Sequence, residues 1–281
     1  MQIYINGKFY AKENAMLSVF DHGLLYGDGV FETLRIYNNI VFKIREHLDR
    51  LFNSAKTINL QIPLSKSQLK NAIEVTIKRN NLKDAYVRVT ITRGVGDIGY
   101  NAKCRVNVII IAKEIPQYSK DIHHKGISVI TYNAERFLPR VKSTNCLPLV
   151  MAKNLAEKKG CFEALLVDNR GYVTEGTVSN IFFVRKFNEE IIIYTPTGNL
   201  LYGITRGFVI ELSKKKFEVK ETKIKKQVIY DFDEAFLTNT TAEIVPVVRI
   251  DNKKIGSGLP GDVTKYFIGE YRCKTHEINK W

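Results

Sequence analysis

The chain has 281 residues, which suits one large domain or two ordinary ones with room for substantial cores. Apolar residues make up 44% and charged residues 26% of the chain, as in globular proteins, so extensive disorder is excluded. The net charge of +14 admits a basic nucleic-acid-binding protein, but the lysines are dispersed and no aromatic–basic signature of an RNA-binding module accompanies them.

The first part of the chain predicts a mixture of strands and helices. The opening MQIYINGKFY predicts a strand, a turn and a strand, with no basic segment and apolar core of a secretory signal. Residues 30–43 alternate around Asn38-Asn39 as a hairpin does, and REHLDRLFNSAKTI then carries apolar residues at helical spacing. Ser65 and Gln68 form a capping-box pattern ahead of a second helix. Two further strands are predicted over 85–93 and 105–112.

The polar stretch EIPQYSKDIHHKG separates these elements from a second group. After it we predict the following elements: a strand at 127–131, a helix at 148–159, a hairpin around Asn169-Arg170-Gly171, strands at 179–185 and 190–194, and helices opening at 203–205 and near 261. Since strands and helices do not alternate strictly, the fold class predicted is α+β. The domains predicted are residues 1–115, a linker at 116–126, and residues 127–281.

The remaining composition favours a cytoplasmic protein without metal. No run approaches ~18 apolar residues, so no membrane span is expected. The four cysteines are scattered without metal-ligand spacing, which predicts reduced thiols, and the pair His123-His124 has no carboxylate or Cys at ligand distance.

Lys142 is a candidate catalytic residue, because it follows the strand-like LPRV and precedes STN. A lysine performs covalent chemistry as a neutral amine, and Schiff-base formation requires burial or a nearby cation to lower its pKa. The alternative is an ordinary surface lysine, since the chain has 43 Lys and Arg residues.

Glu175, in VTEGTVSN, ends a predicted hairpin strand. It is either an exposed turn residue or the partner of a pyridinium nitrogen in a cofactor that serves as an electron sink. Gly176 would permit close approach of backbone and ligand, and Asn180 would brace the turn.

Three segments are candidates for an anion site. The helix opening at Gly203-Ile204-Thr205 offers free N–H groups, Thr240-Thr241 offers two adjacent hydroxyls, and Arg50 offers a guanidinium. Each also has an ordinary reading, as a helix cap, a polar loop and a solvated helix residue.

Together these segments resemble the class IV aminotransferases, which are the fold-type-IV pyridoxal-phosphate enzymes. LLYGDGVFETLR, HLDRLFNSA, RVKSTN, AKNLAEKKGCFEALLVDNRGYVTEGTVSNIF, GITR and TNTTAEIVPV occur in family order over nearly the whole chain, and VTEGTVSN downstream of VKSTN is the specific pair. The resemblance implies a smaller N-terminal α/β sandwich, a larger C-terminal pseudo-barrel domain, and a homodimer.

The resemblance also implies roles for individual residues. Lys142 would be the Schiff-base lysine and the acid and base of proton transfer, and Glu175 would bind the pyridine nitrogen. The phosphate would be held by a set drawn from both parts of the chain: Arg50, Ile204, Thr205, Thr240 and Thr241.

Within the family, the chain is most similar to branched-chain-amino-acid aminotransferases. Tyr86 and Arg88 resemble their Tyr-x-Arg element, whereas Ile98 and Tyr100 stand where D-specific enzymes carry a basic pair. The implied substrate residues are Tyr26, Phe31, Tyr86, Arg88, Thr240 and Thr241. We therefore expect transamination between an L-amino acid with a branched chain and a 2-oxo acid such as 2-oxoglutarate.

Two features point to other members of the family. Leu147 replaces a tyrosine that many branched-chain members have, and YGDGVFETLR carries Thr33 where many of them have glycine. The alternatives are a D-amino-acid aminotransferase and a 4-amino-4-deoxychorismate lyase.

Overall fold

The computed structural model describes residues 1–119, 121–188, 190–214 and 216–277. Contacts divide the chain into two compact units. The first comprises Met1–Pro116 with Val141–Cys146, and the second comprises Gln117–Arg140 with Leu147–Glu277. The units differ from the predicted domains in one respect, because the short segment that carries Lys142 belongs to the first unit.

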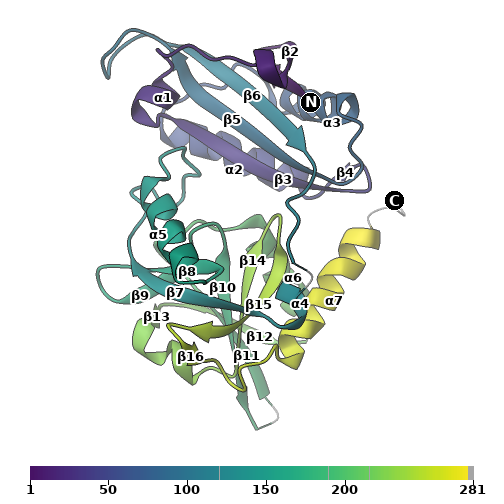
Figure 1. Ribbon diagram of the computed structural model, residues 1–281, viewed down its shortest axis with the longest axis vertical. Coiled ribbons are helices and arrows are strands. Elements are labelled where there is room, and N and C mark those ends of the chain that lie inside the picture. The colour runs from purple at the N-terminus through teal and green to yellow at the C-terminus, as the bar shows by residue number, and fades with distance from the viewer. Residues whose placement is uncertain (120, 189, 215, 278–281) are drawn as a thin grey trace. The chain divides into compact units, whose positions relative to one another are not determined.

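The first unit is built on an antiparallel sheet with the strand order β2-β1-β6-β5-β3-β4 (Figure 1). Its elements are β1 (Gln2–Ile5), β2 (Lys8–Ala11), η1 (Lys12–Asn14), α1 (His22–Tyr26), β3 (Gly29–Tyr37), β4 (Ile40–Val41), α2 (Ile44–Thr57), α3 (Lys66–Arg79), β5 (Ala85–Val95) and β6 (Arg105–Lys113). The predicted strands and helices of this part are thereby confirmed, whereas α1 was not anticipated.

The alternation of β3 explains how its sheet is covered. Val30, Leu34 and Ile36 are fully buried in the core that the sheet forms with α2 and α3, as the period of two in a strand requires. Phe31 and Thr33 point to the opposite face and are half-buried. That second face is therefore the one on which polar and aromatic side chains can meet a ligand.

The predicted capping box at the start of α3 is confirmed. The Gln68 backbone N–H donates to Ser65 Oγ at 3.2 Å, and the Gln68 side chain accepts from the Ser65 N–H at 2.8 Å. These bonds satisfy two of the donors that a helix start leaves unpaired.

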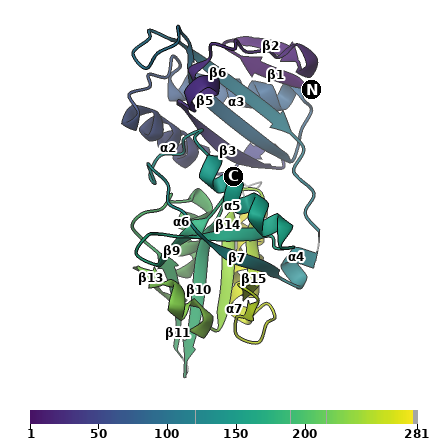
Figure 2. The ribbon, with the colours of Figure 1, turned by 60° about the vertical axis from the view of Figure 1, so that its left-hand side comes forward.

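The second unit contains a larger sheet with the order β12-β11-β10-β14-β15-β7-β8-β9-β13, to which β16 adds beside β15 (Figure 2). Its elements are α4 (Asp121–His124), β7 (Ile127–Asn133), α5 (Leu147–Lys158), β8 (Glu163–Val167), β9 (Tyr172–Gly176), β10 (Asn180–Phe187), β11 (Glu190–Pro196), α6 (Ile204–Ser213), β12 (Glu218–Thr222), β13 (Ile224–Lys225), η2 (Lys226–Asp231), β14 (Glu234–Asn239), β15 (Glu243–Ile250), β16 (Lys253–Lys254) and α7 (Asp262–Glu277). The sheet is nearly closed and barrel-like around an apolar core, which confirms the α+β class.

Two features of the second unit depart from the sequence-based expectation. The predicted linker 116–126 contains the helix α4, and the polar strand β12 pairs in parallel with β11. In the described ranges, no helix combines the length and apolarity needed to cross a membrane.

Candidate functional site

Lys142 lies on a short segment that extends the edge of β3. The Phe31 N–H donates to the Lys142 carbonyl at 2.9 Å, and the Thr144 N–H donates to the Gly29 carbonyl at 2.9 Å. On the side of α2, the Lys142 N–H donates to Ser54 Oγ at 3.2 Å. Main-chain bonds on both sides therefore fix where the lysine side chain leaves the backbone.

The Phe31 ring brings Lys142 together with Arg88. Its centroid lies 4.7 Å from Lys142 Nζ and 3.8 Å from Arg88 Cζ. Arg88 pairs with Thr33 across β3 and β5, so it shares the sheet face of Phe31. A lysine amine, a guanidinium and an aromatic ring thus meet on the face opposite the helices.

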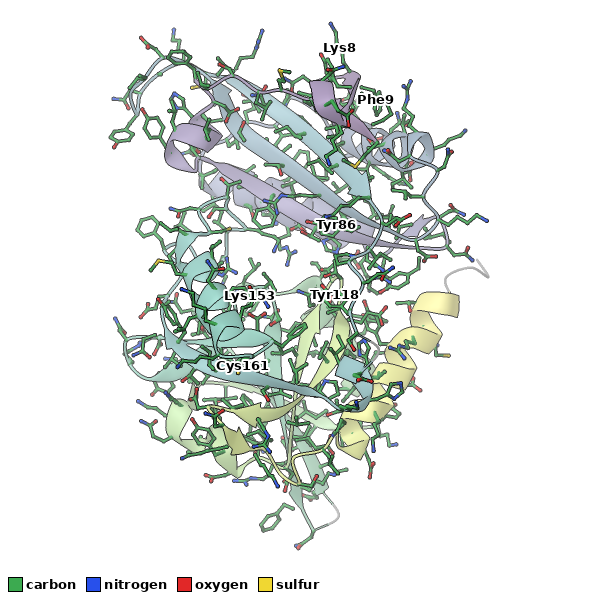
Figure 3. The ribbon with its side chains drawn as sticks, viewed as in Figure 1. Lys8, Phe9, Tyr86, Tyr118, Lys153 and Cys161 are labelled. Carbon is green, nitrogen blue, oxygen red and sulfur yellow. The ribbon has the colours of Figure 1, made fainter. Side chains whose placement is uncertain are left out.

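Tyr86 and Tyr26 lie around this cluster in different ways. Tyr86 (Figure 3) pairs with Arg35 across β3 and β5, which places it two positions from Arg88 on the same face. Tyr26 is on α1, where its hydroxyl accepts from the Gly99 N–H at 3.0 Å and its ring centroid lies 5.2 Å from that of Tyr100. Tyr26 is thus held by the loop after β5.

Arg50 is paired with a buried carboxylate on the helix-covered face of the same sheet. Its Nε and one terminal nitrogen donate to Glu32 at 2.6 and 2.8 Å, and His47 Nδ1 lies 2.8 Å from the same carboxylate. Burial raises the pKa of Glu32, but the charge of Arg50 and the hydrogen bond and charge of His47 outweigh it, so this pKa is well below its usual value. The pKa of His47 is lowered, chiefly by burial.

Neither Glu32 nor His47 was predicted from the sequence, although two signals were present. Glu32 occupies an inward position of an apolar strand, and His47 lies one turn before Arg50 on α2. A carboxylate in such a position requires a cationic partner.

In the second unit, Glu175 is a buried carboxylate at the end of β9, only 2% exposed. Its Oε1 accepts from Arg136 Nε at 2.7 Å and from the Leu201 N–H at 3.1 Å. The reading of Glu175 as an exposed turn residue is therefore wrong. No sequence signal singled out Arg136, because it lies in an irregular segment far along the chain from β9.

The loop that opens α6 is held by Asn180. Its side chain donates to the Leu201 carbonyl at 2.8 Å and accepts from the Gly203 N–H at 3.1 Å. A Cβ on Gly203 would lie 2.2 Å from Asn180 Oδ1, so only glycine fits there. No side chain caps α6, and Thr205 in its first turn is buried. Asn180 thus braces this loop rather than its own turn.

The Thr240-Thr241 turn is organised by Asn239, a residue that was not predicted from the sequence. Asn239 Oδ1 accepts from the backbone N–H and the hydroxyl of Thr241 at 2.7 and 2.8 Å, and its Nδ2 donates to the Val178 carbonyl at 2.6 Å. Tyr118 (Figure 3) places its hydroxyl 2.9 Å from that of Thr241. The turn is thereby tied to the loop that follows Glu175.

Within the described residues, no group of three or more His, Cys, Asp or Glu side chains could hold a metal ion.

The family model described as amino-transferase class IV matches residues 29–250. Among curated proteins, the chain is 44% identical over 275 residues to a putative branched-chain-amino-acid aminotransferase of Methanocaldococcus jannaschii, with 94% of this chain and 93% of that protein covered. It is 36% identical over 270 residues to a D-alanine aminotransferase of Bacillus licheniformis, with 94% of each covered.

A solved structure extends the likeness to the fold. The branched-chain amino acid aminotransferase of T.th., complexed with N-(5'-phosphopyridoxyl)-L-glutamate, superimposes with a TM-score of 0.90 at 34% identity. The match covers 98% of this chain and 93% of that one.

Proposed function

Because the chain belongs to the class IV aminotransferase family, we propose that it transfers an amino group between a branched-chain L-amino acid and a 2-oxo acid such as 2-oxoglutarate. The cofactor is pyridoxal 5'-phosphate, as in this family. The observation that carries the substrate is the cluster of Lys142, Phe31 and Arg88. It joins an amine, an aromatic wall and a carboxylate-binding cation on one sheet face.

The side chains present fit pyridoxal phosphate. The second unit offers a buried carboxylate in Glu175 for a ring nitrogen, and a helix start without a side-chain cap at Ile204 and Thr205 for a phosphate. Thr240 and Thr241 would add donors for the same phosphate, or for a substrate carboxylate. The first unit would supply Arg50 and Lys142.

Each of these residues has a distinct proposed task. When bound, pyridoxal phosphate supplies an electron sink for the charge that develops at the substrate Cα. Lys142 would carry the proton between that carbon and C4′ of the cofactor. Glu175, held by Arg136, would keep the ring nitrogen protonated, and Arg88 would bind the substrate carboxylate. Phe31, Tyr26 and Tyr86 would exclude water and favour aliphatic side chains, each buried methylene adding ~0.8 kcal/mol.

The loop after β5 supports the L-specific reading. Ile98 and Tyr100 are both exposed, and neither offers the cationic pair that D-specific enzymes use to bind the substrate carboxylate. A hydrophobic residue and a phenol cannot replace two charge-assisted hydrogen bonds to a desolvated carboxylate.

A half-reaction panel tests the proposal. Purified holoenzyme is mixed separately with L-leucine, L-isoleucine, L-glutamate and D-alanine, and conversion of the cofactor from its aldehyde to its amine form is followed by absorbance. We expect the L-amino acids to react faster. Faster reaction with D-alanine would assign the chain to the D-amino-acid group, and pyruvate release from aminodeoxychorismate without any half-reaction would make it a lyase.

We also propose a cytoplasmic homodimer. The four cysteines are all free thiols, which accords with a reducing compartment. Sedimentation equilibrium of the holoenzyme measures the oligomeric state directly.

A further inference from the structure

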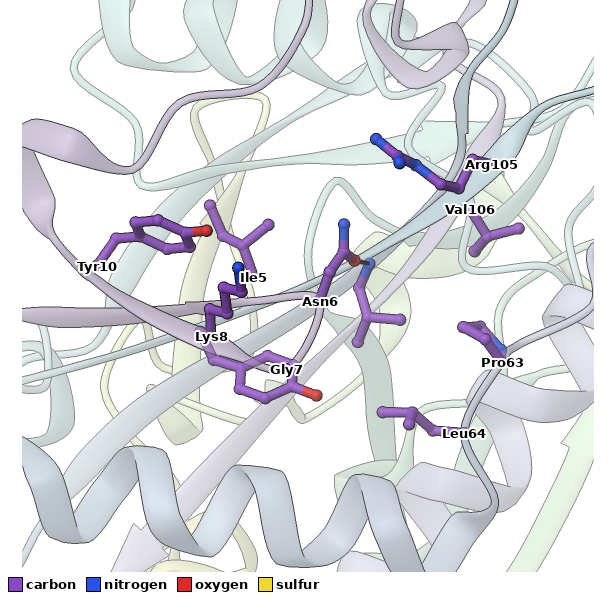
Figure 4. Close-up of a pocket in the computed structure, with 11 residues that line it drawn as sticks. Ile5, Asn6, Gly7, Lys8, Tyr10, Pro63, Leu64, Arg105 and Val106 are labelled. Carbon is purple, nitrogen blue, oxygen red and sulfur yellow. Dashed lines mark hydrogen bonds between the residues drawn. The ribbon is translucent and has the colours of Figure 1, made fainter.

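A hollow in the first unit lies where the β1–β2 hairpin, the start of β6 and the loop before α3 meet (Figure 4). Its volume is about 500 Å³, within the range of roughly 300–1,000 Å³ of small-molecule sites. None of the residues to which the proposed reaction assigns a task lines it. The hollow is therefore available for a second ligand.

The side chains around this hollow suit an anion with an apolar body. Lys8 and Arg105 line it, and none of its lining residues is acidic. In the part of the chain that the structure describes, neither cation makes an ion pair or a side-chain hydrogen bond. Figure 4 shows Lys8 on one side of Asn6 and Arg105 on the other, with Pro63 and Leu64 as an apolar wall.

One wall of the hollow is anchored to β6. Asn6, in the turn of the β1–β2 hairpin, donates from its side chain to Asn107 Oδ1 at 2.7 Å and accepts from the Val108 N–H at 2.8 Å. Its own backbone N–H donates to the Val108 carbonyl at 3.0 Å. Because three bonds hold Asn6, a ligand that contacts it acts on a fixed group.

From Asn107 a buried polar chain continues to α1. Asn107 Nδ2 donates to Asp21 Oδ2 at 2.6 Å, and both residues are at most 3% exposed. Asp21 Oδ1 accepts from the Gly23 N–H at 2.7 Å and so caps α1, the helix that carries Tyr26. Buried hydrogen bonds in a low-dielectric interior polarise one another, so a change at Asn6 is felt at the cap.

We propose that the hollow is a second, regulatory site for a small carboxylate with an apolar body. The carboxylate binds Lys8 and Arg105, and the apolar body packs on Pro63 and Leu64. Occupancy is transmitted to α1 through Asn6, Asn107 and Asp21. The site is distinct from the one that binds the amino acid.

Binding is tested by isothermal titration calorimetry of holoenzyme with 4-phenylbutyrate. The double variant Lys8→Gln/Arg105→Gln is compared with Lys12→Gln/Lys103→Gln, which removes the same charge from exposed positions outside the hollow. We expect one binding component to weaken at least about tenfold in the first variant only, since each lost charged hydrogen bond is worth roughly tenfold or more. Equal affinity in both variants would place the ligand elsewhere and overturn the proposal.

The neutral analogue 4-phenylbutyramide provides a test without mutation. It keeps the apolar body and lacks the charge, so we expect it to bind this component at least about tenfold more weakly. Binding of the amide as tightly as the acid, or no saturable binding of the acid at millimolar concentration, would also overturn the site.

Transmission is read by hydrogen–deuterium exchange of the α1 amides, which needs no turnover. We expect 4-phenylbutyrate to slow exchange there in wild-type holoenzyme and in Lys12→Gln/Lys103→Gln. No slowing is expected in Lys8→Gln/Arg105→Gln. Unchanged α1 exchange in wild type at saturation, or equal slowing in both double variants, would overturn the transmission.

Discussion

Glu32 is fully buried between apolar neighbours on β3 and yet ionised. Removing a carboxylate from water costs several kcal/mol unless it is paired and hydrogen-bonded. Arg50 and His47 provide that pairing. A buried pair of this kind fixes the guanidinium in one position, which is the property that an anion-binding arginine needs.

Glu32→Gln should therefore destabilise the protein by about 3–5 kcal/mol, because it leaves the Arg50 charge without its carboxylate. Urea unfolding followed by circular dichroism measures the change. Glu46→Gln on the same helix as Arg50 removes an exposed pair with Lys43 and should cost at most about 1 kcal/mol. Similar midpoints for the two variants would show that the buried pair contributes no more than a surface one.

Stability should also depend on pH through His47. Its folded-state pKa is lowered from 6.5, so the unfolded chain binds more protons just below that value. The contribution is thus fully present above about pH 6.5 and is lost as the pH falls; that of Glu32, lowered from 4.5, is lost at lower pH. The unfolding free energy should fall between about pH 7 and 5, and His47→Gln should flatten this fall whereas His124→Gln, at an exposed position, should not. A parallel decline in both variants would exclude His47 as the source.

Glu175→Gln tests the residue assigned to the ring nitrogen. A neutral amide still accepts a hydrogen bond from Arg136 but no longer favours ring protonation. We expect cofactor to be retained and single-turnover proton transfer to slow by ~2.7–4 kcal/mol of barrier, the usual value of one preorganised electrostatic contact. Glu218→Gln, an exposed change on β12, serves as control. An unchanged single-turnover rate would remove Glu175 from this role.

At the scale of single elements, α6 offers two glycines with opposite expectations. Gly203→Ala would push a methyl group against Asn180 Oδ1, whereas at Gly207 an added Cβ meets nothing within 4 Å. We expect Gly203→Ala to shift the helix start and weaken pyridoxal-phosphate affinity about tenfold or more, since the phosphate-binding N–H groups move with it. Gly207→Ala should leave affinity unchanged and stabilise α6 by about 0.5–1 kcal/mol. Equilibrium dialysis measures both affinities, and equal values would exclude the α6 start as the phosphate site.

Elements with local signals were predictable. The capping box of α3 and the apolar stripe of α2 each depend on residues three or four positions apart, so the sequence alone reveals them. β12 is a short, exposed, polar strand that exists because β11 lies beside it. Its sequence carries no alternation, so only tertiary structure could define it.

At the scale of the whole molecule, the charge of +14 should assist the approach of anionic substrates. Salt screens this attraction, with a Debye length of ~10 Å at 0.1 M that shortens to ~3 Å at 1 M. We expect kcat/KM for 2-oxoglutarate to fall severalfold with added salt, and kcat/KM for 4-methyl-2-oxopentanoate, which carries one charge fewer, to fall less. Steady-state rates at a series of salt concentrations check this. An identical dependence for the two acids would show that the field plays no part.

The candidate residues were predictable to a different extent from their surroundings. Lys142 and Glu175 stand in motifs that can be read along the chain, and these assignments remain predictions for the variants to test. The partners Arg136, Asn239 and Glu32 lie in ordinary sequence and acquire meaning only from contacts with distant residues. Pairwise contacts across long separations leave no periodic trace in one sequence.

The segment Val141–Cys146 belongs to the first unit, although the residues on both sides of it belong to the second. The polypeptide therefore passes from one unit to the other more than once, and a single peptide cleavage after Pro116 would leave the lysine attached to the second unit. A gene fragment that ends at Pro116 would encode a sheet without the strand-like edge that accompanies β3. Recombination that exchanges the first unit as one contiguous block would always separate the lysine from Phe31, so the two units have had to be inherited together.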